Sequence, residues 1–122
     1  MRKIYHLSTC STCQKIIREL GGLQGFEFQN IKEKNIDART LDGLAKQVGS
    51  YEALFSRRAM KYKSLGLNQQ ELTEKDYRKW ILEEYTFLKR PVIIIDSEIF
   101  IGNAPTEVAR AKAYLKSNTQ TR

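Results

Sequence analysis

The sequence predicts an α/β fold built on a four-stranded mixed sheet, and three stretches of the chain support this prediction. A strand, a helix and a second strand follow one another over residues 3–31. Amphipathic helices fill the middle of the chain, over residues 39–85. Two apolar strands and a last helix complete it, over residues 92–115. This alternation favours a sheet covered by helices, because each element must bury its apolar face against another.

The N-terminal part is predicted to be a strand–helix–strand unit. Residues 3–7 form a short, largely apolar strand. Over residues 13–20, apolar side chains recur at helical spacing on one face, and Gly21-Gly22 supplies the backbone freedom that ends a helix. Residues 26–31 alternate between apolar and polar and form the second strand. Such a unit implies that the two strands pair in parallel.

The middle of the chain, about residues 39–86, is predicted to be a helical insertion between the two halves of the sheet. Asp37 or Thr40 is expected to cap its first helix. A longer helix is expected to begin after Thr73, with Asp76 in the place of the acid of a capping box.

Four residues of this insertion are expected to contribute to its core. Leu65 and Leu67 are the expected anchors of the basic and irregular stretch over residues 56–69. Trp80 and Ile81 are the best core candidates of the longer helix.

The C-terminal part is predicted to be a hairpin followed by a helix. Residues 92–95 are apolar on both faces, which is typical of a buried central strand. A tight turn at 96–98 leads to a partner strand at 99–101, and Pro105 suits the first turn of a last helix. The order β-α-β, helices, β-β-α is that of a thioredoxin-like fold. Residues 1–122 are therefore predicted to form a single thioredoxin-like domain that carries the helical insertion.

Composition narrows the functional classes. With 122 residues, 41% hydrophobic and 29% charged, the chain suits one globular domain with its own core. No apolar run is long enough to span a bilayer, and the N-terminus shows no secretory signal, so we expect a cytoplasmic location. We also expect a monomer. The net charge of +7 comes without a nucleic-acid motif. We therefore expect a solvated basic surface, or positive charge for an anionic substrate or partner, and no direct nucleic-acid binding.

The two cysteines, Cys10 and Cys13, are the strongest functional signal. In the cytoplasm such a pair is more often catalytic, redox-sensing or metal-binding than a structural disulfide. Even with His6 the chain falls short of the four ligands of a tetrahedral zinc site, so no metal is expected. A C-x-x-C at a strand-to-helix turn indicates redox chemistry, and two ordinary buried cysteines are the alternative.

The helix that starts at this turn is expected to activate Cys10. Free amide N–H groups and the partial positive charge at a helix N-terminus favour an anion, and the thiolate is the nucleophilic form of cysteine. Cys13, one turn further in, is then the natural resolving thiol. The amides of Ser11, Thr12 and Cys13 form a nest for an oxyanion beside the sulfur of Cys10, while the two hydroxyls have helix capping as their alternative role.

Arg90 and His6 are expected to complete the site. Arg90 precedes Pro91 at the start of the buried strand, and in a thioredoxin-like fold this proline faces the reactive cysteine. A cis peptide is compatible with Pro91 and would hold Arg90 where it can bind an oxyanion through two hydrogen bonds. His6 lies four residues before Cys10, and a charged imidazole there would stabilise the thiolate. A surface arginine and a structural histidine are the alternatives.

The chain resembles the arsenate reductase (ArsC) family of thioredoxin-fold proteins, which includes the Spx regulators. Three separated features carry the resemblance, namely Ile4-Tyr5-His6 ahead of Cys10, Ala53-Leu54-Phe55-Ser56-Arg57 with a downstream Leu65-Gly66-Leu67, and Arg90-Pro91-Val92-Ile93-Ile94. The resemblance covers nearly the whole chain.

The resemblance implies that Cys10 attacks arsenate to give a cysteine–arsenate adduct, which glutathione and glutaredoxin then reduce. The activating histidine of the family corresponds to His6, and its arginine before the cis-proline corresponds to Arg90. Arg57 is the best placement for an arginine of the helical insertion. The third anion-binding arginine is missing, because Asn103 stands at its expected position.

Cys13 also departs from the glutathione-dependent pattern, which usually has a serine there. Spx-like proteins carry a C-x-x-C as a disulfide switch, but this chain continues with Gln14-Lys15 where an arginine and a lysine are usual in Spx. We therefore expect a thiol-dependent oxidoreductase without a bound cofactor, which takes electrons from glutathione, glutaredoxin or thioredoxin. The alternative is an Spx-like regulator that acts on RNA polymerase through a Cys10–Cys13 disulfide. A general glutaredoxin-like disulfide reductase would share the same site.

Overall fold

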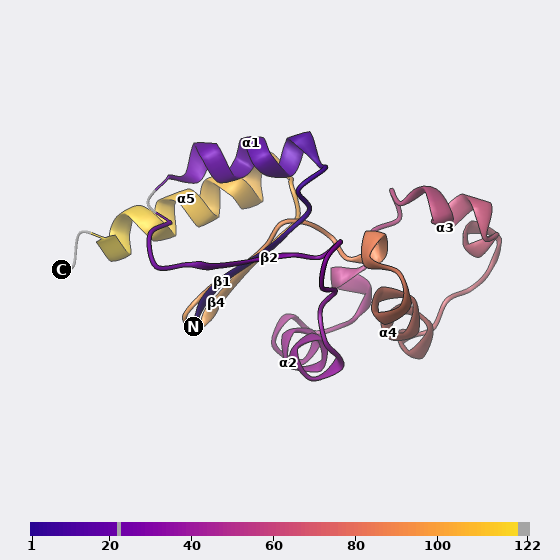
Figure 1. The fold of residues 1–122 in the computed structure, drawn as a ribbon. Coiled ribbons are helices and arrows are strands. Elements are labelled where there is room, and N and C mark those ends of the chain that lie inside the picture. The colour runs from indigo at the N-terminus through magenta and orange to yellow at the C-terminus, as the bar shows by residue number, and fades with distance from the viewer. Residues whose placement is uncertain (22, 120–122) are drawn as a thin grey trace. The chain divides into compact units, whose positions relative to one another are not determined.

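The computed structural model describes residues 1–21 and 23–119 (Figure 1). The chain forms two compact units. Residues 1–34 and the part that follows residue 89 make up the sheet unit, and Asn35–Lys89 make up the helical unit. The helical unit includes the whole of the predicted insertion, and the assignment of the chain to a single domain stays a prediction.

A four-stranded mixed sheet forms the centre of the sheet unit, in the order β2-β1-β3-β4. Its strands are β1 (Arg2–His6), β2 (Glu27–Asn30), β3 (Val92–Ile95) and β4 (Glu98–Ile101). β1 pairs in parallel with β2 and antiparallel with β3, and β3 and β4 form an antiparallel hairpin. The predicted mixed sheet, its parallel pair and its hairpin are confirmed.

Two helices, α1 (Ser11–Leu20) and α5 (Pro105–Thr119), lie side by side on one face of this sheet (Figure 1). The core between helices and sheet consists of apolar side chains from both layers, namely Ile4, Ile16, Leu20, Phe26, Ile93, Ile95, Phe100, Ala111 and Leu115. α1 begins two residues before the predicted start and ends at Gly21, whose φ of 56° is in the left-handed region. Gly22, the second residue of the predicted stop, lies outside the described residues.

The helical unit contains three α-helices and three short 3₁₀ turns among its residues. The α-helices are α2 (Ala38–Val48), α3 (Met60–Ser64) and α4 (Glu74–Glu83), and the turns are η1 (Glu52–Leu54), η2 (Leu67–Gln69) and η3 (Tyr85–Phe87). α3 lies in the stretch that the sequence predicts to be irregular. It has no buried residue, so it leaves no apolar periodicity in the sequence.

The core of the helical unit differs in part from the predicted one. Leu67 and Ile81 are buried as expected, whereas Leu65 is 46% exposed and Trp80 is half-buried. Leu65 is the C-cap of α3, and the left-handed Gly66 that follows turns the chain so that Leu67 points inward. The prediction for Leu65 is therefore wrong.

The helix caps follow the sequence closely. The side chain of Asp37 accepts a hydrogen bond of 2.7 Å from the backbone N–H of Thr40, so Asp37 is the N-cap of α2. At α4, Thr73 accepts from the N–H of Asp76, and the Asp76 carboxylate accepts from the N–H of Thr73 at 2.8 Å. The predicted capping box is confirmed.

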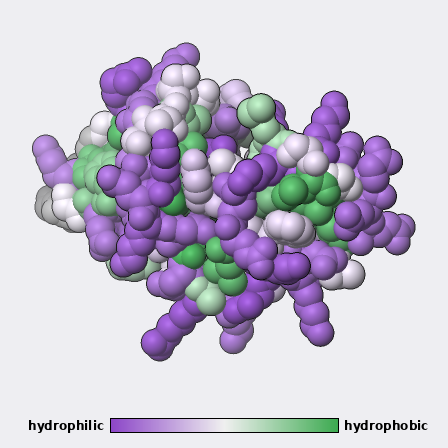
Figure 2. Space-filling view, turned by 45° about the vertical axis from the view of Figure 1, so that its right-hand side comes forward, coloured by the Kyte–Doolittle hydropathy of each residue, from purple (hydrophilic) through white to green (hydrophobic). Residues whose placement is uncertain are grey.

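Most of the surface in the space-filling view is hydrophilic, and apolar atoms appear only in separate patches (Figure 2). Within the described part of the chain, no helix combines the length and apolar character that crossing a bilayer requires.

Replacing Thr73 by alanine removes the hydroxyl that accepts the Asp76 N–H. We expect Thr73→Ala to lower the free energy of unfolding by about 1 kcal/mol, as measured by urea unfolding followed by far-UV circular dichroism. The matched control is Thr73→Ser, which keeps the hydroxyl and should unfold close to the wild type. Equal losses in both variants would show that the cap does not stabilise α4.

Candidate functional site

Cys10 and Cys13 lie at the start of α1, where the chain leaves β1. Cys10 is the N-cap residue, with extended backbone angles, and its side chain is partly exposed. Cys13 is one turn further along and only 1% exposed. Both are free cysteines, so the structure presents one accessible and one buried thiol on the same helical turn.

The loop that positions Cys10 is held by hydrogen bonds to both neighbouring elements. The carbonyl of Leu7 accepts from the backbone N–H of Cys10 at 3.0 Å and from the side-chain amide of Gln14 at 3.4 Å. At the end of β2, the Asn30 amide donates to the Ser8 hydroxyl at 2.8 Å. These contacts fasten the cysteine loop to the carboxyl edge of two parallel strands.

The supporting roles of Gln14 and Asn30 are absent from the sequence prediction. For Asn30 one signal exists, since the carboxyl ends of parallel strands meet at the same edge of a sheet. A polar residue that ends β2 therefore lies beside the loop that follows β1. For Gln14 we find no comparable signal.

The first turn of α1 offers backbone donors to an anion. A helix leaves its first N–H groups without internal partners, and Cys10 makes no side-chain cap. The N–H groups of Ser11, Thr12 and Cys13 have no hydrogen-bond acceptor among the described residues, and the turn contains no acidic residue. Since Cys10 occupies the N-cap, the two hydroxyls do not have the capping position that was their alternative role. The turn is arranged to receive an anion beside the sulfur of Cys10.

Cys13 has an environment that keeps its thiol protonated. Burial raises the pKa of Cys13, and negative charge on Cys10 acts in the same direction. A backbone hydrogen bond from Leu7 and the positive charge of Arg90 oppose these effects without reversing them. The two thiols therefore differ in exposure, and burial disfavours the thiolate form of Cys13.

Arg90 and Pro91 stand at the entry to β3. The peptide bond between them is cis, as the sequence analysis allowed, and Pro91 is buried. The Pro91 carbonyl accepts a hydrogen bond of 2.9 Å from the N–H of Gly102. The half-buried Arg90 is close enough for its charge to act on Cys13, so it lies within electrostatic range of the first turn of α1.

His6 is the last residue of β1, and its surroundings disfavour the predicted charge. Its ring packs edge-to-face against Phe28, with 5.8 Å between centroids, and its Nδ1 is buried without a hydrogen-bond partner. Burial lowers the pKa of His6, and the weaker attraction of Glu33 does not compensate. The neutral imidazole therefore dominates at neutral pH, contrary to the charged form that the sequence analysis expected.

Arg57 is the last of the predicted site residues, and Asn103 stands where the resemblance leads us to expect a third arginine. Arg57 belongs to the helical unit, where it donates to Glu52 at 2.6 Å and to the hydroxyl of Tyr77 at 2.9 Å. Asn103 is exposed in the connection between β4 and α5. Cys10, Cys13, His6 and Arg90 all lie in the sheet unit, whereas a contribution of Arg57 to their chemistry stays a prediction.

The described residues contain no group of three or more histidine, cysteine, aspartate or glutamate side chains that could hold a metal ion. The hydrogen-bond donors that the cysteine turn presents are backbone N–H groups, which suit an anion.

Comparison with known proteins places this site in a family. Three solved structures share the fold. An ArsC-family-related protein from Bacteroides fragilis has a TM-score of 0.77 and 21% identity, and the match covers 90% of this chain and 96% of that one. An arsenate reductase from Vibrio cholerae has a TM-score of 0.74 and 20% identity, with 90% of this chain and 96% of that one covered. An arsenate reductase (ArsC) related protein from Brucella melitensis has a TM-score of 0.66 and 29% identity, with 94% of each chain covered. They confirm the predicted thioredoxin-like fold. Among curated proteins, none matches the chain significantly.

The sequence model of the ArsC family matches residues 5–111, which include the cysteine turn, the helical unit and the Arg90-Pro91 pair. A match of this extent shows that the chain belongs to the ArsC family.

Proposed function

We propose that this protein is a thiol-dependent oxidoreductase that reduces a small oxyanion of the arsenate type, with Cys10 as the nucleophile. The observation that carries the proposal is the N-cap position of Cys10. There its sulfur is partly exposed beside three N–H groups that have no acceptor among the described residues. A nucleophile and an anion-binding turn in one place are what attack on an oxyanion requires.

The first chemical step forms a covalent adduct. The thiolate of Cys10 attacks arsenic, a sulfur–arsenic bond forms, and one arsenate oxygen takes up protons and leaves as water. Arsenic stays pentavalent in this step. The N–H groups of Ser11, Thr12 and Cys13 stabilise the remaining oxygens, and Arg90 is the nearest candidate for a cationic partner of the adduct.

The second step transfers the electrons. A second thiolate attacks the sulfur of Cys10, so that a disulfide forms while the sulfur–arsenic bond breaks. The electron pair of that bond goes to arsenic, which leaves as trivalent arsenite. An external thiol, glutathione or a glutaredoxin- or thioredoxin-type protein, then reduces the disulfide and restores Cys10.

Two thiols compete for this second step. Cys13 is on the same helical turn, but burial raises its pKa, so only a small fraction of it is thiolate at neutral pH. Glutathione is exposed to solvent and has no such restriction. We propose that an external thiol resolves the adduct, and that Cys13 resolves it only when the external thiol is scarce.

A second function, an Spx-like redox switch, is favoured by one specific observation. The two free cysteines stand three positions apart on one helical turn, the arrangement that a reversible Cys10–Cys13 disulfide needs. In this alternative the disulfide alters binding to RNA polymerase and no substrate is turned over.

Activity of the reconstituted system tests the first proposal. We expect arsenate-dependent oxidation of NADPH in the presence of glutathione, glutaredoxin and glutathione reductase, and loss of this activity to background in Cys10→Ser, which lacks the nucleophile. Cys13→Ser is the matched control and should retain turnover at saturating glutathione. Wild-type turnover no higher than that of Cys10→Ser would refute the arsenate reductase proposal.

Redox-dependent binding tests the alternative. A switch predicts that immobilised RNA polymerase retains the wild-type protein in only one of its two states, oxidised with mild oxidant or reduced with dithiothreitol. Cys13→Ser cannot form the disulfide and should behave identically under both conditions. Equal retention of the wild-type protein in both states, or retention in neither, would rule the switch out.

The protonation of His6 is measurable without interference, because it is the only histidine in the chain. We expect its ring protons in an NMR titration to shift with a midpoint below about 6.5, the ordinary value, since burial disfavours the charged ring. The folded state then binds fewer protons than the unfolded one between the two midpoints, so His6 contributes a loss of stability as the pH falls below about 6.5. The urea-unfolded protein is the control. A folded-state midpoint at or above the unfolded one would contradict this expectation and support the charged form of His6.

A further inference from the structure

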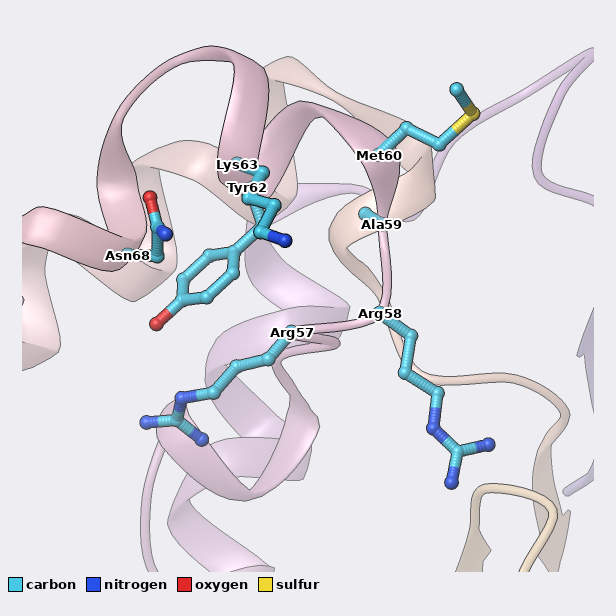
Figure 3. A pocket seen from close by; sticks show the side chains of 7 residues that line it. All are labelled: Arg57, Arg58, Ala59, Met60, Tyr62, Lys63 and Asn68. Atoms are coloured by element: carbon cyan, nitrogen blue, oxygen red, sulfur yellow. The ribbon is translucent and has the colours of Figure 1, made fainter.

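A groove on the helical unit is lined by residues of α3 and its two flanks. Its volume is about 520 Å³, and its lining includes Arg57, Arg58, Met60, Tyr62, Lys63 and Asn68 (Figure 3). In the close view, Tyr62 and Asn68 lie on one side and Met60 on the other, with the two arginines extending below them. We call this feature the α3 groove. It lies within the helical unit and uses neither cysteine.

The α3 groove carries more positive charge than its surroundings neutralise. Residues 57–63 contain two arginines and two lysines and no acidic residue. Arg57 is paired with Glu52, and Lys61 with Glu84. Arg58 and Lys63 form no ion pair with any described residue, and both are exposed. The groove therefore presents two cations that are available to an anionic partner.

Apolar surface is exposed beside these cations. Met60 is 89% exposed and Leu65 is 46% exposed, and no residue of α3 is buried. Large apolar side chains leave water when a surface is covered, and methionine adapts to differently shaped partners because its side chain is unbranched and flexible. A cationic groove with an exposed methionine at its side can thus bind a partner through both charge pairing and apolar contact.

Tyr62, which lines the groove, packs against a cluster of aromatic rings. The ring of Phe55 stacks on Phe87 at 5.0 Å between centroids and contacts Tyr77 at 4.9 Å and Tyr62 at 5.9 Å. The N–H of Ser56, next to Arg57, donates to the Phe87 carbonyl at 2.7 Å. These contacts position Tyr62 and the backbone beside Arg57 at the groove.

We propose that the α3 groove binds an acidic segment of a partner protein, whose carboxylates pair with Arg58 and Lys63 and whose aliphatic side chain covers Met60. The two exposed cations favour an acidic partner, and the exposed methionine favours a polypeptide over a nucleic acid. Single-stranded nucleic acids are typically bound on exposed aromatic rings, whereas the ring of Tyr62 packs against Phe55 and is half-buried. This docking surface goes beyond the thiol chemistry and does not depend on it.

A labelled acidic peptide tests the proposal on the full-length protein. The probe is fluorescein-Asp-Glu-Leu-Asp-Glu-Leu-Asp-Glu, and its binding is followed by fluorescence anisotropy at low and at physiological salt. We expect the double variant Arg58→Glu/Lys63→Glu to weaken binding about tenfold or more. Lys112→Glu/Lys116→Glu, on exposed positions of α5, makes the same change in net charge and should alter binding by less than about twofold. Circular dichroism confirms that each variant is folded.

The apolar part is tested separately. We expect Met60→Ser, and a probe whose leucines are replaced by serine, each to weaken binding about threefold or more. Equal affinities in the α3 and α5 double variants, full affinity in Met60→Ser, or no binding of the probe to the wild type would each overturn the proposal. An oligothymidylate of similar length that binds more tightly than the peptide would also overturn it, in favour of a nucleic-acid surface.

Discussion

The site depends on a constraint that every α-helix shares, because the first N–H groups of a helix cannot be satisfied from within it. Many helices meet this constraint with a serine, threonine or aspartate at the N-cap, as α2 and α4 do with Asp37 and Thr73. α1 begins instead with Cys10, which makes no side-chain cap. The unmet donors are then available to an anion, beside a sulfur that can attack it. A ligand that binds at this helix end could supply the missing acceptor.

The same turn makes two chemically similar residues different. Cys10 and Cys13 share one helical turn, but only the second points into the core, where its thiolate would be poorly solvated. This asymmetry supports the attacking role that we propose for Cys10, without a specific base. It also removes the need for a charged His6, whose ring lies against Phe28 and is favoured in the neutral form. The helix amides and Arg90 are then the positive groups that the sheet unit brings to the site.

Local signals were enough to predict the cysteine turn and the capping box at Thr73, since each depends on neighbours in sequence, and they allowed the cis peptide before Pro91. Properties set by distant residues were missed. The pKa of His6 is lowered by burial, its ring contacts a ring on the adjacent strand, and the support from Asn30 comes from the end of that strand. Leu65 has an apolar side chain, but the turn at Gly66 directs it outward. Short segments such as α3 contain too few buried positions for any periodicity to be read.

Oxyanion reduction and a disulfide switch begin from the same thiolate and differ in what next bonds to the sulfur of Cys10. In both, a second thiol ends up bonded to this sulfur, and the two electrons go to arsenic in the reductase and to an added oxidant in the switch. The candidates for this second thiol are Cys13 and a thiol from solution. Proximity favours Cys13, because an intramolecular partner needs no encounter. Burial opposes it, because the thiolate is the reactive form and Cys13 is held as the thiol. Any change that exposes Cys13 therefore shifts the protein from turnover with an external thiol toward its own disulfide. Arg90 acts on this balance as well, since its charge lowers the pKa that burial raises, and an anion that neutralises it would make Cys13 less reactive.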